Sequence, residues 1–191
     1  VDKKYIFVMI LIAIILAPIS FFFVLEDYQR ARILALFNPS EHFQYGAYNT
    51  VMSKSVIANG GIRGTGYGLG VGTNMHIVPM QYTDFIFSAY AEQFGMIGSV
   101  FLLLLYVTII LCGFLRIGKY KDEFWEFVVI GVSAVYAFHV FENVGMNLGI
   151  LPVTGIPLPF ISYGGTSTFV FSALVGLLIK ARVISRSARQ I

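Results

Sequence analysis

Two acidic residues, Asp84 and Glu92, stand at the start of a long apolar stretch and are the residues best suited to proton transfer. If a helix begins near Thr83, steps of three and four residues bring the small and polar residues of this stretch within an arc of about 80°. These residues are Asp84, Ser88, Glu92, Gly95 and Ser99. A carboxylate that faces lipid is costly, so the stripe is expected to face protein or a cavity. Asp84 lies at the end of this stretch, at the level expected for lipid head groups.

The other members of this stripe have a simpler explanation. Small residues and hydroxyls on one helix face commonly pack against a second helix, and this interpretation is favoured for Ser88, Gly95 and Ser99. Glu92 lies about 12 Å deeper than Asp84 along the helix axis. It is therefore either part of a substrate site or a buried partner for a basic residue elsewhere in the protein.

A second polar stripe lies between residues 127 and 148. Its members recur at spacings of three and four: Tyr136, His139, Asn143 and Asn147, with Glu142 beside them. His139 and Glu142 are three residues apart and can touch, which would suit a metal ion or a proton relay. One histidine with one carboxylate is weak support for either. A hydrogen-bonded network between helices is the favoured interpretation.

The stretch 149–165, GILPVTGIPLPFISYGG, separates two apolar segments. Its Pro152, Pro157 and Pro159 prevent a regular helix, because proline lacks a backbone donor and clashes with the preceding turn. Unpaired backbone amides in hydrocarbon cost several kcal/mol each, so such a segment must be covered by protein or line a wet cavity. It is either one wall of a site or an ordinary turn between helices.

The composition is that of an integral membrane protein. Of the 191 residues, 57% are hydrophobic and 12% are charged, which is too few charges for a soluble surface. The hydropathy pattern predicts an all-α fold with four membrane spans, at about 5–25, 85–115, 127–148 and 165–179. They are joined and followed by a large loop at 26–83, a Pro/Gly loop at 149–164 and a basic tail at 180–191.

Basic residues near span ends predict the orientation, because Lys and Arg favour the cytoplasmic side. Nine of the 13 basic residues fall on one side of a four-span topology: Lys3, Lys4, Arg116, Lys119, Lys121, Lys180, Arg182, Arg186 and Arg189. Both ends of the chain are therefore expected in the cytoplasm, and the loops 26–83 and 149–164 on the outer side. The single cysteine, Cys112, excludes an intrachain disulfide and a zinc site built from cysteines.

The loop 26–83 is rich in glycine, but no G-x-G-x-x-G or Walker pattern runs through it, which argues against a nucleotide site. Glycine lets the backbone approach a ligand closely, so the loop either moulds over a sugar or pyrophosphate or acts as a flexible tether. The loop also carries Arg30, Arg32, Lys54 and Arg63. Solvated charge is the ordinary explanation for each of them.

Three stretches resemble, in order, signatures of the SEDS family of bacterial membrane proteins, the RodA, FtsW and SpoVE type. They are YQRARI at 28–33, YTDFIFSAYAEQFGMIGS at 82–99 and the stretch 149–165. The resemblance covers nearly all of the chain. It implies a domain of ten membrane helices, of which the last four are present, so the chain is expected to be the C-terminal half of that domain.

The resemblance implies polymerisation of lipid II into peptidoglycan glycan strands, by inverting glycosyl transfer at the outer face of the bacterial cytoplasmic membrane. Asp84, in TDFIF, matches the family's essential aspartate and would deprotonate the acceptor hydroxyl. Arg32 matches the family's arginine and would either stabilise the leaving pyrophosphate, together with a divalent cation such as Mg²⁺ if one is needed, or lock the loop 26–83. Other expected substrate contacts are Gln29, Arg63, Glu92, Pro152, Ser162, Gly164 and Gly165.

Further implied partners are a class B penicillin-binding protein, which is a transpeptidase, and membrane lipids. No nucleic acid and no metal site built from protein ligands are expected. Two other functions remain open. A lipid II flippase would need a polar path across the membrane, and residues 100–115 offer little to line one. In a non-catalytic membrane scaffold for a transpeptidase, Asp84 would be dispensable.

The chain departs from the family pattern in two places. Before TDFIF, only Pro79 remains of a common PExH form, and a common acidic pair is reduced to Glu92 followed by Gln93. These departures weaken any role for a second carboxylate or for His76.

Overall fold

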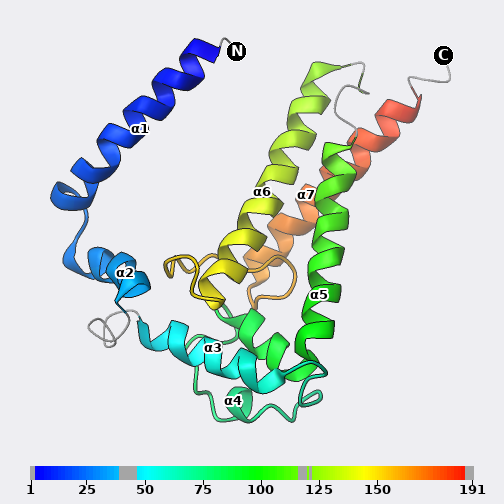
Figure 1. Ribbon diagram of the computed structural model, residues 1–191. Helices are drawn as coiled ribbons and strands as arrows, with labels where there is room; N and C mark the ends of the chain where they lie inside the picture. The colour runs from blue at the N-terminus through cyan, green and yellow to red at the C-terminus, as the bar shows by residue number, and fades with distance from the viewer. Residues whose placement is uncertain (1–2, 39–46, 116–119, 121, 188–191) are drawn as a thin grey trace. The chain divides into compact units, whose positions relative to one another are not determined.

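The computed structural model describes residues 3–38, 47–115, 120 and 122–187. The secondary structure of these residues is helical, as the sequence predicts (Figure 1). The helices are α1 Lys3–Phe23, α2 Asp27–Phe37, α3 Tyr48–Gly60, α4 Val71–Asn74, α5 Ile86–Phe114, α6 Glu123–Asn147 and α7 Gly165–Ser187. The chain forms two compact units, residues 1–48 and 49–191. Arg116, Lys119, Lys121 and Arg189, which entered the orientation argument, lie outside the described residues.

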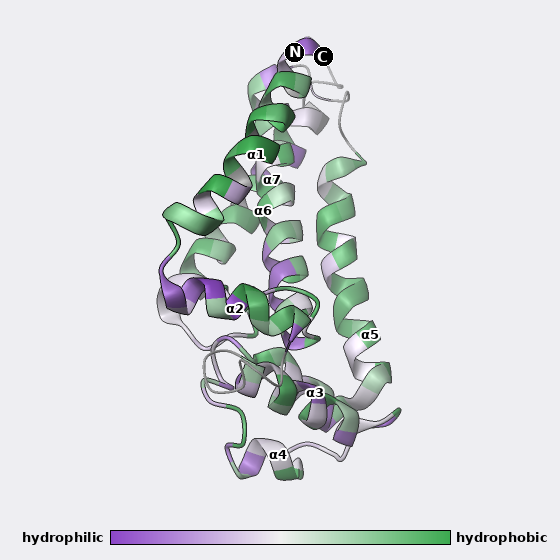
Figure 2. Ribbon diagram, turned by 60° about the vertical axis from the view of Figure 1, so that its left-hand side comes forward, coloured by the Kyte–Doolittle hydropathy of each residue, from purple (hydrophilic) through white to green (hydrophobic). Residues whose placement is uncertain are grey.

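Helices α5, α6 and α7 are each long and apolar enough to cross a membrane, and α1 with α2 passes the same test as a bent pair. Figure 2 shows hydrophobic residues along most of α5, in contrast to the mixed colouring of α3. The three long helices fall on segments expected to span. Helix α7 continues past the expected end at 179 into the basic tail. The chain is therefore part of a multi-pass membrane protein.

In the first unit, a side chain of α2 is hydrogen-bonded to the C-terminal end of α1. Arg30 donates a hydrogen bond of 2.6 Å from its guanidinium to the Phe22 carbonyl and lies 3.7 Å from the Asp27 carboxylate. The side-chain oxygen of Gln29 accepts from the Glu26 backbone N–H at 3.1 Å, which caps the first turn of α2.

The expectation of an irregular loop at 26–83 is wrong in part, because α2, α3 and α4 lie within it. Helix α3 has a weak helical signature, with serine, asparagine and β-branched residues. Tertiary packing stabilises it, since Val56 is buried against Val78 and Phe85.

Helix α5 is broken at Gly95, where φ is 65° and ψ is −167°. The segment 61–66 fills the break with its own backbone, so the amides and carbonyls freed by the break are paired, as an apolar span requires. Four hydrogen bonds do this: Thr65 and Gly66 N–H donate to the Glu92 and Gln93 carbonyls at 2.9 and 3.1 Å, and Met96 and Ile97 N–H donate to the Gly61 and Ile62 carbonyls at 2.9 and 3.2 Å.

This contact explains two of the loop glycines. A Cβ on Gly60 or Gly64 would collide with the backbone of α5, at the carbonyls of Ala91 and Gln93 respectively. Close backbone approach is therefore needed, as glycine allows. At Gly60 and Gly64 the loop backbone packs directly against the backbone of α5. These two glycines therefore serve neither as a ligand contact nor as a flexible tether, the two roles considered from the sequence.

Helix α6 is delimited by local signals at both ends. The Asp122 side chain accepts from the Phe124 N–H at 2.9 Å at its start. At its end Gly149 has φ 67°, and the Ile150 N–H donates to the Gly145 carbonyl at 2.8 Å. Residues 149–165, named the Pro/Gly segment from here on, then run without helix to the start of α7. Leu158 of this segment is fully buried in a cluster with Phe87, Leu102 and Tyr106 of α5.

Candidate functional site

Asp84 lies in a turn directly before α5 and is not on the helix, because α5 begins at Ile86 with Phe85 as its N-cap. The Met80 carbonyl accepts from the N–H groups of Thr83, Asp84 and Phe85 at 3.2, 3.1 and 3.3 Å. Met80 itself has φ 54°, a left-handed conformation that is uncommon for a residue with a side chain. A strained turn that is stabilised by its surroundings is frequent at functional sites.

Two asparagines of α6 hold the turn from the other side. Asn143 donates from its amide nitrogen to the Asp84 carbonyl at 2.9 Å, and Asn147 donates to the same oxygen at 3.2 Å. The Asn147 side-chain oxygen accepts from the Ser88 N–H at 3.1 Å, in the first turn of α5. Both asparagines are fully buried. Because buried amides need partners, their position fixes the backbone of Asp84 relative to α6.

The Pro/Gly segment is bonded to the same turn. The Ser162 hydroxyl donates to the Thr83 carbonyl at 2.6 Å and accepts from the Leu158 N–H at 2.8 Å. The Tyr163 N–H donates to the Tyr82 carbonyl at 2.8 Å. Asn143 also donates to the Ile156 carbonyl at 2.8 Å, so one side chain links the turn and the segment.

The carboxylate of Asp84 is half-buried and has no hydrogen bond or ion pair with another described residue. It lies beside Gly155, which has φ 77°, and a Cβ added there would be 3.4 Å from Asp84 Oδ2. A cavity of about 430 Å³ adjoins this turn, lined by Tyr82, Ile86, Ile161 and Tyr163. Within the described residues, the structure therefore leaves this carboxylate without a donor.

The remaining expected residues of the Pro/Gly segment have looser surroundings. Pro152 and Pro157 are half-buried, and Ser162 is buried. Gly165 begins α7, and a Cβ there would meet no atom within 4 Å, while one on Gly164 would lie 3.5 Å from the Ser167 Cβ. The structure therefore places Ser162 and Gly155 next to the turn of Asp84. Gly164 and Gly165 have space for a side chain.

Gln29 and Arg32 belong to the first unit. Gln29 caps α2, and its side-chain nitrogen donates to the Tyr28 hydroxyl at 3.3 Å. Arg32 is exposed, with its guanidinium 5.7 Å from the centre of the Tyr28 ring. Arg63 is exposed on the segment that fills the break in α5.

Glu92 has a structural role. Its fully buried carboxylate accepts from the N–H groups of Gly72 and Thr73, both at 2.8 Å, and from the Thr73 hydroxyl at 2.6 Å. These donors lie in α4, whose N-cap Gly70 has no side chain to cap it. Among the described residues no basic side chain pairs with Glu92. Within the described residues, backbone and hydroxyl donors therefore pair with this carboxylate.

The polar stripe of α6 forms the hydrogen-bonded network that the sequence favours. The Nδ1 atom of His139 lies 3.2 Å from the Pro157 carbonyl oxygen. The Thr154 hydroxyl donates to the Glu142 carboxylate at 2.9 Å. His139 and Glu142 thus contact different residues of the Pro/Gly segment. In the described parts of the chain, no three His, Cys, Asp or Glu side chains gather as a metal site would require.

Sequence reasoning missed three features of the site. Asn143 and Asn147 were recognised as polar and inward-facing, but nothing in the pattern showed that they bind the turn of Asp84. Gly155 is one glycine among many, and Tyr82 and Tyr163 are ordinary residues at a membrane edge. A signal was present only for the asparagines, whose spacing of four puts them on one helix face.

The chain is similar to peptidoglycan glycosyltransferases from several bacteria. It is 37% identical over 162 residues to the peptidoglycan glycosyltransferase MrdB of Escherichia coli K12, covering 85% of this chain and 44% of the relative. It is 35% identical over 168 residues to the peptidoglycan glycosyltransferase RodA of Treponema pallidum, covering 88% and 38%. The chain thus spans less than half the length of these relatives.

A chain of a solved peptidoglycan synthase complex, described as showing structural coordination of polymerization and crosslinking, matches with a TM-score of 0.74. Its sequence identity is 28%, and the match covers 95% of this chain and 50% of the other. The family model of the FtsW, RodA and SpoVE cell cycle proteins matches residues 2–187. The chain belongs to this family, the SEDS proteins that its signature stretches resemble.

Proposed function

We propose that the complete protein polymerises lipid II into glycan strands and that Asp84 is the general base. The observation that carries the proposal is the carboxylate of Asp84, which lies on a turn fixed by hydrogen bonds and has no partner among the described residues, while Tyr82 of the same turn lines a cavity. The similarity to peptidoglycan glycosyltransferases supports the reaction class.

In the proposed reaction, Asp84 removes the proton from the 4-hydroxyl of the GlcNAc on an acceptor lipid II. The oxygen attacks C1 of the MurNAc on a lipid-linked donor, and the bond from C1 to the pyrophosphate oxygen breaks. Undecaprenyl pyrophosphate leaves with the bonding electrons, and the configuration at C1 inverts. General base catalysis of this kind contributes about 10² to 10⁴ in rate.

The residues around Asp84 act by positioning. Asn143 and Ser162 keep the turn and the Pro/Gly segment in one arrangement, and such preorganisation lowers the entropic cost of reaching the transition state. Gly155 leaves space for the acceptor beside the carboxylate. Tyr82 and Tyr163 offer exposed aromatic surface to a sugar ring. Arg32, Arg63 and a divalent cation are candidates to stabilise the leaving pyrophosphate.

The orientation and the partner are part of the same proposal. The turn of Asp84 lies at the end of α5 remote from the basic residues of α7, which favours a site on the outer side of the cytoplasmic membrane and a cytoplasmic C-terminus. The related structure is a complex that couples polymerization to crosslinking. We therefore propose a transpeptidase of the class B penicillin-binding type as the partner.

The test uses the full-length protein with Asp84→Asn, which keeps the size of the side chain but cannot accept the proton. Glycan strand formation from labelled lipid II is expected to fall by about 10² to 10⁴, while lipid II binding and folded yield stay near wild type. Polymerisation at the wild-type rate would exclude Asp84 as the base and favour the scaffold alternative. Transport of lipid II across liposomes by a wild type that makes no polymer would favour a flippase.

A further inference from the structure

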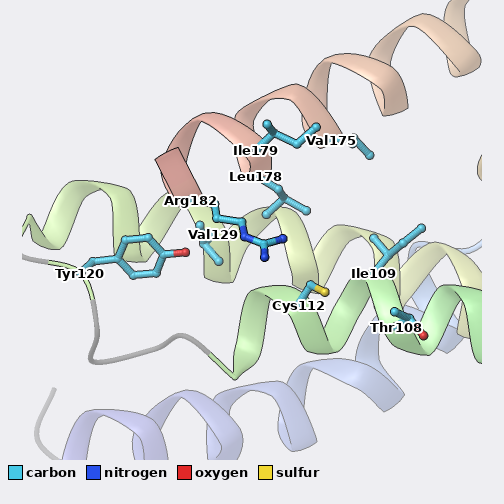
Figure 3. Close-up of a pocket in the computed structure, with 9 residues that line it drawn as sticks. All are labelled: Thr108, Ile109, Cys112, Tyr120, Val129, Val175, Leu178, Ile179 and Arg182. Carbon is cyan, nitrogen blue, oxygen red and sulfur yellow. The ribbon is translucent and has the colours of Figure 1, made fainter. Parts of the chain in front are cut away.

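A second cavity, unconnected with the chemistry above, lies between α5, α6 and α7 near the end of α7. Its volume is about 300 Å³, at the lower end of the roughly 300–1,000 Å³ range of small-molecule sites. Apolar side chains of all three helices line it, among them Ile109, Val129, Val175 and Leu178. Figure 3 shows these side chains converging on the gap between the helices.

Arg182 and Tyr120 carry polar groups at one end of this cavity, and Thr108 lies at the other end (Figure 3). The Arg182 guanidinium projects from α7 into the gap toward Cys112, and the Tyr120 hydroxyl points in the same direction (Figure 3). Arg182 is exposed and has no hydrogen bond or ion pair with another described residue. Lys180, two residues away, instead lies 5.5 Å from the centre of the Trp125 ring. Among the described residues that line this cavity, Arg182 is the cation.

The depth of Arg182 suits a lipid head group. It lies 17 residues after Gly165, or about 26 Å along α7, close to the roughly 30 Å thickness of the hydrocarbon core. An arginine at this level keeps its charge at the head-group layer while its stem stays in apolar surroundings. Basic pockets between membrane helices on the cytoplasmic side commonly bind anionic lipid head groups.

We propose that this cavity binds an anionic phospholipid, with one acyl chain between α5, α6 and α7 and the phosphate on Arg182. A guanidinium matches a phosphate in geometry and charge, and the apolar lining matches an acyl chain. The inference is independent of the proposed glycosyl transfer, because no residue of the Asp84 site lines the cavity.

Cys112 provides the readout, since it lines the cavity, is exposed and is the single cysteine of these 191 residues. The full-length protein, with any cysteines outside this chain replaced, is placed in nanodiscs of phosphatidylglycerol or of phosphatidylcholine with the same acyl chains. The rate of Cys112 alkylation by N-ethylmaleimide is then measured. Phosphatidylglycerol is expected to slow alkylation at least threefold relative to phosphatidylcholine.

Two variants make the test specific. Arg182→Gln is expected to remove the difference between the two lipids, and Lys180→Gln, the matched control on the same helix, is expected to keep it. Soluble glycerol phosphate is expected to give no protection, because it lacks the acyl chains. Equal rates in both lipids with wild type, or an unchanged difference in Arg182→Gln, would overturn the proposal. Cys112 that stays unreactive in lipid-free detergent would also overturn it, because protein would then fill the cavity.

Discussion

Asp84 and Glu92 are carboxylates eight residues apart, and the structure gives them opposite surroundings. Asp84 is half-buried, and its carboxylate has no hydrogen bond within the described residues. Glu92 is fully buried and accepts three hydrogen bonds from Gly72 and Thr73. The backbone carbonyls do not differ in this way, since that of Asp84 accepts from two asparagines of α6 and that of Glu92 accepts from the N–H and the hydroxyl of Thr65.

This contrast is between a carboxylate that has no partner among the described residues and one that accepts several hydrogen bonds. In Asp84 the protein fixes the main chain and leaves the side chain free, which suits proton transfer to and from a ligand. In Glu92 the side chain is itself the fixed part, since it caps α4 and holds the glycine-rich loop against α5. The position of an acidic residue in a signature stretch therefore does not tell whether it is catalytic or structural. Its hydrogen bonds are needed to distinguish the two roles.

The largest expected effect tests this contrast through stability. Glu92→Gln keeps one side-chain oxygen and replaces the other by an N–H₂ group, so either the Gly72 N–H or the two Thr73 donors lose their acceptor. The free energy of unfolding is expected to fall by about 3 kcal/mol, against less than about 0.5 kcal/mol for Asp84→Asn. Unfolding of both full-length variants in the same detergent measures the difference. Equal stabilities would remove the structural role assigned to Glu92.

The next prediction concerns the asparagine that positions Asp84. Asn143→Leu has a similar volume but no amide to hold the Asp84 and Ile156 carbonyls. Polymerisation is expected to fall about 30-fold, or about 2 kcal/mol in the barrier, because the turn and the Pro/Gly segment lose a shared bond. Asn74→Leu is the matched control, since Asn74 is exposed and donates only to the Gly68 carbonyl. Similar losses in both variants would contradict the positioning role.

A smaller effect is expected at the glycine beside the carboxylate. Gly155→Val introduces a β-branched side chain at φ 77° within contact distance of Asp84 Oδ2, so the acceptor loses space. Glycan strand formation is expected to fall about tenfold, or about 1.4 kcal/mol in the barrier. Gly165→Val is the control, because a Cβ at Gly165 meets nothing within 4 Å. A larger loss of glycan strand formation in Gly165→Val than in Gly155→Val would mean that the start of α7, and not Gly155, limits the space for the acceptor.

The smallest expected effect is at Ser162. Ser162→Ala removes one donor to the Thr83 carbonyl and one acceptor for the Leu158 N–H, and a loss of about 1 kcal/mol in stability is expected. Ser172→Ala removes an exposed hydroxyl that bonds within α7, and its unfolding should match wild type. If both alanine variants unfold alike, the bond between Ser162 and the Asp84 turn contributes nothing measurable.

The sequence by itself was sufficient for the all-α membrane fold and the family. Long apolar segments determine helices in lipid because each backbone group must be paired within its own segment. Prolines and glycines determined that residues 149–164 are not helical. The inward direction of Glu92, Asn143 and Asn147 also followed from helical periodicity, since buried polar groups must face protein.

Only the tertiary structure decided what those inward groups touch. Periodicity along one helix carries no information on the segment that packs against it, so the donors to Glu92 and the acceptors of Asn143 could not be derived. The break at Gly95 depends on the segment 61–66, more than 25 residues away, whose backbone pairs the freed groups. Likewise, the sequence predicted a helix start near Thr83, but Asp84 lies in a turn before α5. Hydrogen bonds from this turn to Met80, Asn143 and Ser162 stabilise it. Hydrogen bonds between distant segments are a property of the folded chain, and within the described residues they pair the carboxylate of Glu92 and leave that of Asp84 unpaired.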